Sequence, residues 1–246
     1  MAVARTRSAQ ILFLHHSTGA NVWQGGVPEA IEAHNRAKGT QYAIVEQFFP
    51  KDAPYGWANY PYDYWNIWVQ HAGPAAYLEE PTLEILAKKY DLIVFKHCFP
   101  VASVEPDDGA PDITSKKKTL GNYKVQYEAL KRKLREFRRT KFLVWTGATL
   151  AQSATNQAEA GRAAEFFGWV RGTWDEKGDN IFLWDFAQLE TEGGLCLKRE
   201  FEAQPGDSHP GPDFCKRVAP LLARRIVNVL EGRGDTSSLT GEAAAS

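Results

Sequence analysis

Two short polar blocks near opposite ends of the chain hold residue types that together could cleave an ester. The first block, HHSTG at 15–19, follows a short apolar run, and the second, DSH at 207–209, precedes the last predicted helix. A serine hydroxyl becomes a nucleophile when a base takes its proton, and a carboxylate can hold that base in the right tautomer. Ser17 is therefore the candidate nucleophile, His209 the candidate base and Asp207 the candidate acid.

The apolar run before Ser17 supports this interpretation. It reads ILFL at 11–14, and such a short unbroken run is typical of a central parallel strand that is buried on both faces. Reactive groups of open α/β sheets lie just beyond the carboxyl ends of the strands. The alternative is structural, because serine and threonine also cap helices, and Ser17 and Thr18 could only begin the next helix.

Five short apolar runs alternate with helical patterns along the chain. This alternation predicts a three-layer α/β/α fold around a central five-stranded parallel sheet, of the flavodoxin-like type. No internal repeat or linker divides the pattern, so residues 1–231 are expected to form one domain. Residues 232–246 are rich in Gly, Ser, Thr, Ala and Glu, which predicts a disordered tail. The expected strands are 11–14, 42–49, 91–95, 141–145 and 180–184, and the expected helices are 27–36, 81–89, 123–139, 157–174 and 212–230.

Composition argues against several classes of partner. The 246 residues carry a formal net charge of −1, so nothing indicates binding to nucleic acid or to an anionic membrane. The apolar runs are too short to span a bilayer, and residues 1–10 are too polar for a signal peptide. We expect a cytoplasmic protein, or one exported with a leader that this sequence lacks. The cysteines form neither a metal-like pair nor a disulfide framework, and no cofactor is expected.

Further polar side chains follow the third and fifth predicted strands. KHC at 96–98 ends the third strand, and Asp185 ends the fifth. Because all strands of a parallel sheet point the same way, these groups should gather at one rim with Ser17. The histidines there could support the site from a second shell or, alternatively, hold a metal ion in a metal-dependent hydrolase. The histidines in question are His15, His16 and His97, with Asp207 or His209 as further ligands.

The segment KDAPYGWANYPYDYWNIW at 51–68 is an unusual predicted loop. It is too polar and too rich in proline for a core helix, and too aromatic for a simple linker. Long loops of this kind tend to be functional, and aromatic rings over the site would suit an acetylated carbohydrate substrate. The alternative is a cover that packs over the sheet.

The order of these blocks on this predicted fold resembles the SGNH/GDSL hydrolase superfamily, in a divergent form. In that family the nucleophile follows the first strand in a Gly-Asp-Ser block, and the acid and base stand together before the last helix. HHS at 15–17 and DSHP at 207–210 take those places here. The resemblance implies an esterase or deacetylase that forms an acyl-enzyme, with a small-molecule or carbohydrate ester as its substrate and an unknown oligomeric state.

Two departures from the family pattern leave alternatives open. The family spaces acid and base as Asp-x-x-His, and Asp207 is one residue closer than that to His209. Asp185 could orient the histidine instead, or Ser17 and His209 could work as a dyad. The family's Gly-x-Asn-Asp block, whose Asn donates to the oxyanion, is absent from the end of the third strand.

A missing oxyanion donor costs roughly 3–4 kcal/mol of transition-state stabilisation. The Ser17 backbone N–H would be one donor by resemblance, and Asn59, Asn66 or Lys96 could supply the other. A non-catalytic carbohydrate-binding or interaction module on a hydrolase scaffold is therefore a further interpretation.

Overall fold

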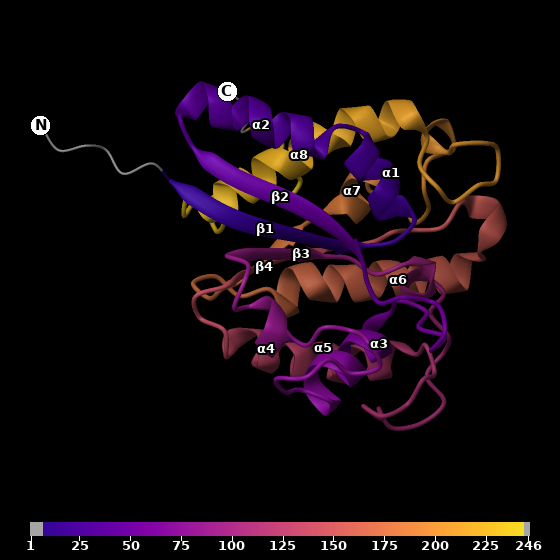
Figure 1. Ribbon diagram of the computed structural model, residues 1–246. Coiled ribbons are helices and arrows are strands. Elements are labelled where there is room, and N and C mark those ends of the chain that lie inside the picture. The colour runs from indigo at the N-terminus through magenta and orange to yellow at the C-terminus, as the bar shows by residue number, and fades with distance from the viewer. Residues whose placement is uncertain (1–6, 244–246) are drawn as a thin grey trace, which may run out of the picture.

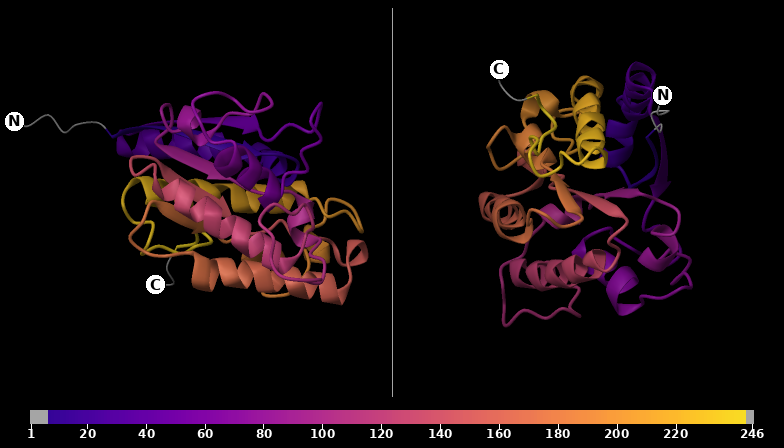
Figure 2. Two further views of the ribbon diagram at one scale, coloured as in Figure 1. Left: turned by 90° about the horizontal axis from the view of Figure 1, so that it is seen from below. Right: turned by 90° about the vertical axis from the view of Figure 1, so that its left-hand side faces the viewer.

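The computed structural model describes residues 7–243, and its centre is a parallel sheet with the strand order β2-β1-β3-β4-β5. This is the flavodoxin-like order, so the predicted three-layer fold is confirmed. Helices cover both faces of the sheet (Figures 1 and 2). The strands are β1 (Ser8–His15), β2 (Gln41–Phe48), β3 (Leu92–Phe95), β4 (Lys141–Trp145) and β5 (Ile181–Trp184).

The helices divide between the two faces of the sheet. In Figure 1, α1, α2, α7 and α8 lie above the sheet, and α3, α4, α5 and α6 lie below it. None of the helices within residues 7–243 is long and apolar enough to cross a membrane. The helices are α1 (Thr18–Gln24), α2 (Val27–Lys38), α3 (Pro61–Trp65), α4 (Leu83–Leu86), α5 (Leu120–Arg135), α6 (Gln157–Trp169), α7 (Phe186–Thr191) and α8 (Pro212–Leu230).

The middle of β1 separates two hydrophobic cores. Ile11 and Phe13 pack into the core under α2 and α8, whereas Leu12 and Leu14 pack into the core that contains α3, α5 and α6. Alternate side chains of a strand point to opposite faces, so a strand covered on both sides must be apolar throughout. The carboxyl end of β1, after which α1 begins, lies on the right of Figure 1.

The end of α1 lies directly against α8. A Cβ atom at Gly25 would collide with the Cys215 carbonyl oxygen, so only glycine permits this approach. The contact matters for the site because α1 begins at the Ser17 turn and α8 follows the loop that carries His209.

The prediction of a loop at 51–68 is wrong for its second half. Residues 61–65 form α3, and a π-helical turn follows at Asn66–Gln70. Tyr64 and Trp68 are completely buried in the core. Their polar atoms are satisfied, because the Tyr64 hydroxyl donates to the Lys96 carbonyl at 2.8 Å and Trp68 Nε1 donates to the Pro81 carbonyl at 3.1 Å. Most of these aromatic rings therefore build the core, as in the alternative of a packed cover.

The prediction of a disordered tail is wrong for residues 232–243. The buried guanidinium of Arg225 donates to the carbonyls of Leu183 and Gly234, at 2.7 and 2.6 Å, and to Ser237 Oγ at 2.8 Å. Trp184 Nε1 also donates to the Thr240 carbonyl, at 2.9 Å. These bonds fasten the segment along β5, because buried polar groups of the sheet and of α8 require partners. The remaining residues of the predicted tail, 244–246, lie outside the described part of the chain.

Candidate active site

Ser17 occupies a sharp turn between β1 and α1. Its φ of 49° and ψ of −111° are unusual for a residue other than glycine. The turn closes within a few residues, because the Gly19 N–H donates to the His16 carbonyl at 2.8 Å and the Asn21 N–H donates to the Ser17 carbonyl at 3.1 Å. Such strained backbone persists where the surroundings enforce it, commonly at functional sites. The Ser17 hydroxyl makes no capping bond to α1, contrary to the structural alternative.

The Ser17 hydroxyl instead meets a residue from near the other end of the chain. Ser17 Oγ is hydrogen bonded to His209 Nε2. On the opposite side of the ring, His209 Nδ1 lies 2.8 Å from Asp207 Oδ1. With Nδ1 protonated and donating to Asp207, Nε2 is free to accept the Ser17 proton. The structure thus brings the three sequence-predicted residues together in the order that a nucleophile, base and acid require.

A local turn explains how Asp207 reaches His209 across the shortened spacing. Asp207 Oδ1 accepts the backbone N–H of His209 at 2.8 Å as well as the ring Nδ1–H. An aspartate that accepts the N–H two residues ahead forms an Asx turn, which folds the acid back beside the base. The hydrogen bonds from the His209 backbone and then from its ring hold the pKa of Asp207 below its ordinary value, because they stabilise the carboxylate.

Further contacts hold the His209 loop, residues 202–210. The Glu202 carboxylate accepts the Gly206 N–H at 2.6 Å, and Ser208 Oγ accepts the Ala151 N–H at 3.0 Å. The second bond ties the loop to the segment that follows β4. The ring of Phe99, just after β3, meets the His209 ring edge-on at 5.0 Å. The imidazole is therefore positioned from two sides.

Asp185, the alternative acid, is engaged elsewhere. Its Oδ1 accepts Thr146 Oγ1–H at 2.6 Å, pairs with Arg171 at 3.1 Å and caps the first turn of α7. The expectation that Asp185 could orient His209 is therefore not met, since the carboxylate of Asp207 holds the ring and that of Asp185 holds Arg171.

The two asparagines proposed as oxyanion donors have other partners. Asn66 donates to the Tyr62 hydroxyl and accepts from His71, both at 3.0 Å. Asn59 is buried, and its Nδ2 donates to the Phe49 carbonyl at 2.9 Å. These bonds serve the segment after β2, and no bond links either side chain to Ser17 or His209. Both side-chain amides that were proposed as oxyanion donors therefore have other hydrogen-bond acceptors.

Lys96 is buried under the Ser17 turn. Its Nζ lies 3.4 Å from the His16 carbonyl oxygen and 3.6 Å from Cys98 Sγ. A Cβ at Gly19 would be 3.0 Å from Lys96 Cδ, so the lysine stem passes directly below the start of α1. Burial lowers the pKa of Lys96. The ammonium therefore supports the peptide that precedes Ser17 rather than the serine hydroxyl.

Glu190 is a buried carboxyl that the sequence patterns did not reveal, because it lies within α7 with no motif around it. Its Oε1 accepts the Thr149 N–H at 2.6 Å, while Oε2 has no hydrogen-bond partner in the described residues. Burial raises the pKa of Glu190 to about 8, and the charge of Lys96 opposes this rise. Lys96 and Glu190 are thus two buried ionisable groups beneath the rim of the sheet, and the charge of Lys96 acts on the Glu190 carboxyl.

The three histidines of the metal-ligand alternative lie in different surroundings, and the ring nitrogens of His97 have no hydrogen-bond partner in the described residues. His15 Nε2 bonds to Glu46 at 2.8 Å, and His16 Nε2 bonds to the Pro50 carbonyl at 2.5 Å. His97 lies among aromatic rings, with Tyr64 edge-on at 4.5 Å. Burial lowers the pKa of His15 and His97 to about 3, so both are neutral. Within residues 7–243 no three His, Cys, Asp or Glu side chains form a group that could hold a metal. The side chains of the metal-ligand alternative are therefore not gathered into a group that could hold a metal ion.

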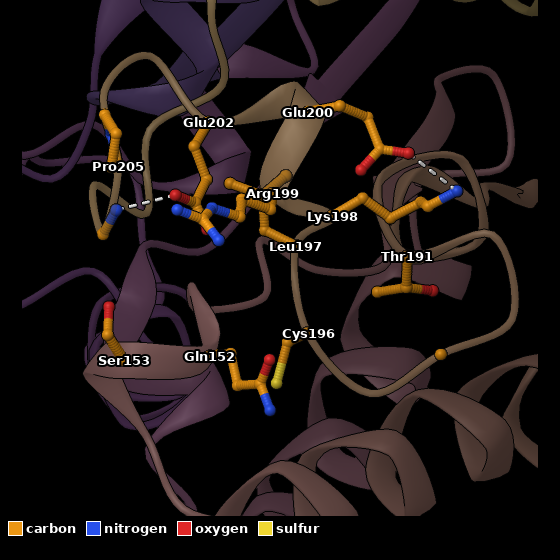
Figure 3. Close-up of a pocket in the computed structure, with 12 residues that line it drawn as sticks. Gln152, Ser153, Thr191, Cys196, Leu197, Lys198, Arg199, Glu200, Glu202 and Pro205 are labelled. Carbon is orange, nitrogen blue, oxygen red and sulfur yellow. Dashed lines mark hydrogen bonds and ion pairs between the residues drawn. The ribbon is translucent and has the colours of Figure 1, made fainter.

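A pocket of about 680 Å³ borders the His209 loop (Figure 3). Glu202 and Gly206 are among the residues that line it, and in Figure 3 the Arg199 guanidinium lies above Gln152. Ser17, Asp207 and His209 do not line this pocket. The hollow therefore lies beside the candidate active site and shares only its loop, while Ser17 lies outside it at the rim of the sheet.

Comparison with known proteins supports the fold. An acetyl xylan esterase superposes with a TM-score of 0.53 and 17% identity, over 85% of this chain and 96% of that chain. A gut microbial diltiazem-metabolizing enzyme gives a TM-score of 0.49 and 10% identity, over 93% of this chain and 48% of that one. No family model matches the sequence, and no curated protein is significantly similar to it. At these identities, the first likeness shows a shared fold, and the second carries no argument.

Proposed function

We propose that this protein is a serine ester hydrolase that forms an acyl-enzyme at Ser17. The observation that carries the proposal is the continuous chain of contacts from Ser17 Oγ through the His209 ring to Asp207. It is presented on a sharp strand-to-helix turn at the carboxyl rim of a parallel sheet, where reactive groups of α/β proteins are found.

The chemistry follows from the order of these groups. His209 Nε2 takes the proton of Ser17 Oγ as the oxygen attacks the ester carbonyl, and the protonated ring then gives that proton to the leaving alcohol. Water, activated by the same ring, then hydrolyses the acyl-enzyme. Asp207, ionised at neutral pH, keeps Nδ1 protonated and stabilises the imidazolium. We assign the Ser17 backbone N–H as one oxyanion donor.

Acetylated carbohydrate is the substrate class that we propose to test first. A protein of the same fold is an acetyl xylan esterase, so acetylated xylan is a suitable trial substrate. The catalytic pair lies at an open rim, and His209 is 39% exposed at its side chain. An open site of this kind leaves room for the bulky alcohol portion of a polymer.

Labelling with a fluorophosphonate, together with hydrolysis of p-nitrophenyl acetate, tests the proposal. The native protein should react with both reagents, and Ser17→Ala should react with neither. Ser115→Ala, which removes a partly exposed serine hydroxyl from the loop before α5, is the matched control and should behave like the native protein. Undiminished labelling of Ser17→Ala would refute the assignment.

A carbohydrate-binding protein without turnover is a second candidate. It is favoured by one observation, that the side-chain amides of Asn59 and Asn66 donate to Phe49 and Tyr62 and make no hydrogen bond to Ser17. Binding of xylo-oligosaccharides by the native protein, without fluorophosphonate labelling or ester hydrolysis, would support this candidate over the hydrolase.

A further inference from the structure

Phe48, the last residue of β2, is an exposed aromatic ring beside the Ser17 turn. Its exposed fraction is 56%, whereas its neighbour Phe49 is completely buried. The Phe48 ring stacks on the His16 ring, with centroids 5.4 Å apart and an interplanar angle of 29°. His16 immediately precedes Ser17. The Phe48 ring therefore packs against the residue that precedes the candidate nucleophile, and the rest of the ring is open to solvent.

The Phe48 ring is also held in place. His16 Nε2 is fixed by the Pro50 carbonyl at 2.5 Å. The His15 ring meets the edge of Phe48, with centroids 5.6 Å apart, and His15 is itself bonded to Glu46. Leaving a large aromatic side chain in water forgoes the free energy of burying it. A rigid exposed ring at a reactive site is thus suited to a ligand that covers it.

We infer that Phe48 is a specificity-determining residue whose exposed face stacks on a sugar ring of the ester substrate. The inference rests on the proposed hydrolase and names the alcohol portion that it binds. A pyranose has an apolar C–H face and a polar rim of hydroxyl groups, which matches a single flat ring among polar neighbours. Gln47 and the exposed Lys51 and Asp52 flank Phe48 in the sequence.

An acyl chain fits this surface less well, because it would need a continuous apolar groove. Phe99 is another ring at the site, and it meets the His209 ring edge-on. Phe99 is only partly exposed. Phe48 is therefore the aromatic face most open to a bulky leaving group.

The test measures binding without turnover. Isothermal titration of acetylated xylo-oligosaccharide into Ser17→Ala protein is compared with titration into Ser17→Ala that also carries Phe48→Ala, Phe48→Leu or Phe48→Trp. Phe48→Ala and Phe48→Leu should weaken binding by about two- to tenfold, the size of one aromatic contact, whereas Phe48→Trp should retain it. Val45→Ala is the matched control, because Val45 is 47% exposed on the same strand and points to the other face.

A parallel assay separates the two proposals. In otherwise native protein, Phe48→Ala should raise KM for the acetylated oligosaccharide more than KM for ethyl acetate, which has no ring to stack. If Phe48 affects binding but the native protein hydrolyses neither ester, the hydrolase proposal fails, whereas the inference that Phe48 stacks on a sugar ring stands.

Three results would overturn the inference that Phe48 stacks on a sugar ring. The first is oligosaccharide binding that Phe48→Ala leaves unchanged, and the second is no oligosaccharide binding by Ser17→Ala protein. The third is a native dimer, seen in sedimentation, that dissociates in Phe48→Ala. Because β2 is an edge strand of the sheet, that result would assign the exposed ring to an interface between two copies of the chain.

Discussion

Replacing Asp207 by asparagine should slow the proposed ester hydrolysis strongly, because this carboxylate is the hydrogen-bond partner of His209 Nδ1. Asp207 Oδ1 accepts both the backbone N–H and the ring Nδ1–H of His209, each at 2.8 Å. The side chain of the introduced asparagine could still accept the backbone N–H. It would carry no charge to stabilise the imidazolium, and its amide could face the ring and favour the wrong tautomer.

The structure sets the expected size of this effect. In a buried triad of this type the same change costs about 10⁴ in kcat. The Asp207 side chain is 39% exposed, so water screens its charge and can partly replace it. We therefore expect a loss of about 10²- to 10³-fold in kcat, or about 3–4 kcal/mol, with a smaller change in KM.

The assay is steady-state hydrolysis of p-nitrophenyl acetate, with thermal unfolding to confirm that each variant is folded. Asp185→Asn is the matched control, because Asp185 is a similarly placed carboxylate that pairs with Arg171 rather than His209. Asp185→Asn should lower the stability of the fold, and it should change kcat little. A large loss of kcat in Asp185→Asn with an active Asp207→Asn would refute this reading of the site.

Three further predictions concern the groups that support the site and the fold. The carboxyl of Glu190 has its pKa raised to about 8, so the folded state holds a proton that the unfolded state releases near its ordinary pKa of 4.5. Stability should fall as pH rises from about 4.5 to 8, and Glu190→Gln should flatten that fall in thermal unfolding. Lys96→Met should lower kcat by about tenfold or more through a loosened Ser17 turn, with little loss of stability, because an apolar side chain can replace a buried charge. Arg225→Met should lower the free energy of unfolding by about 3–5 kcal/mol in urea titrations, because it strands the buried carbonyls of Leu183 and Gly234.

Each of these predictions has an outcome that would contradict it. A decline in stability with pH that is the same in Glu190→Gln would mean that another group causes it. An unchanged kcat in Lys96→Met would show that the Ser17 turn holds its geometry without the ammonium. If Arg225→Met and removal of residues 232–246 both leave stability unchanged, the packing of that segment contributes nothing to the fold.

The sequence by itself determined the architecture and the meeting of Ser17 with His209. The local pattern of apolar residues predicts a buried strand at 11–14 and a buried helix at 212–230. This is possible because the periods of strands and helices are local properties of the sequence. Parallel strands deliver their carboxyl ends to one rim. A serine after the first strand and a histidine before the last helix could therefore be expected to meet there.

Only the tertiary structure decided which partners the remaining polar groups choose. Asp207 reaches His209 through an Asx turn, while Asp185 pairs with Arg171. The spacing of these residues in the sequence does not show which of the two aspartates orients His209. The burial of Tyr64 and the packing of residues 232–243 depend likewise on donors and acceptors far away in the chain. Hydrophobic periodicity reports whether a side chain is buried, but the partner of a polar atom is set by three-dimensional contacts between distant segments.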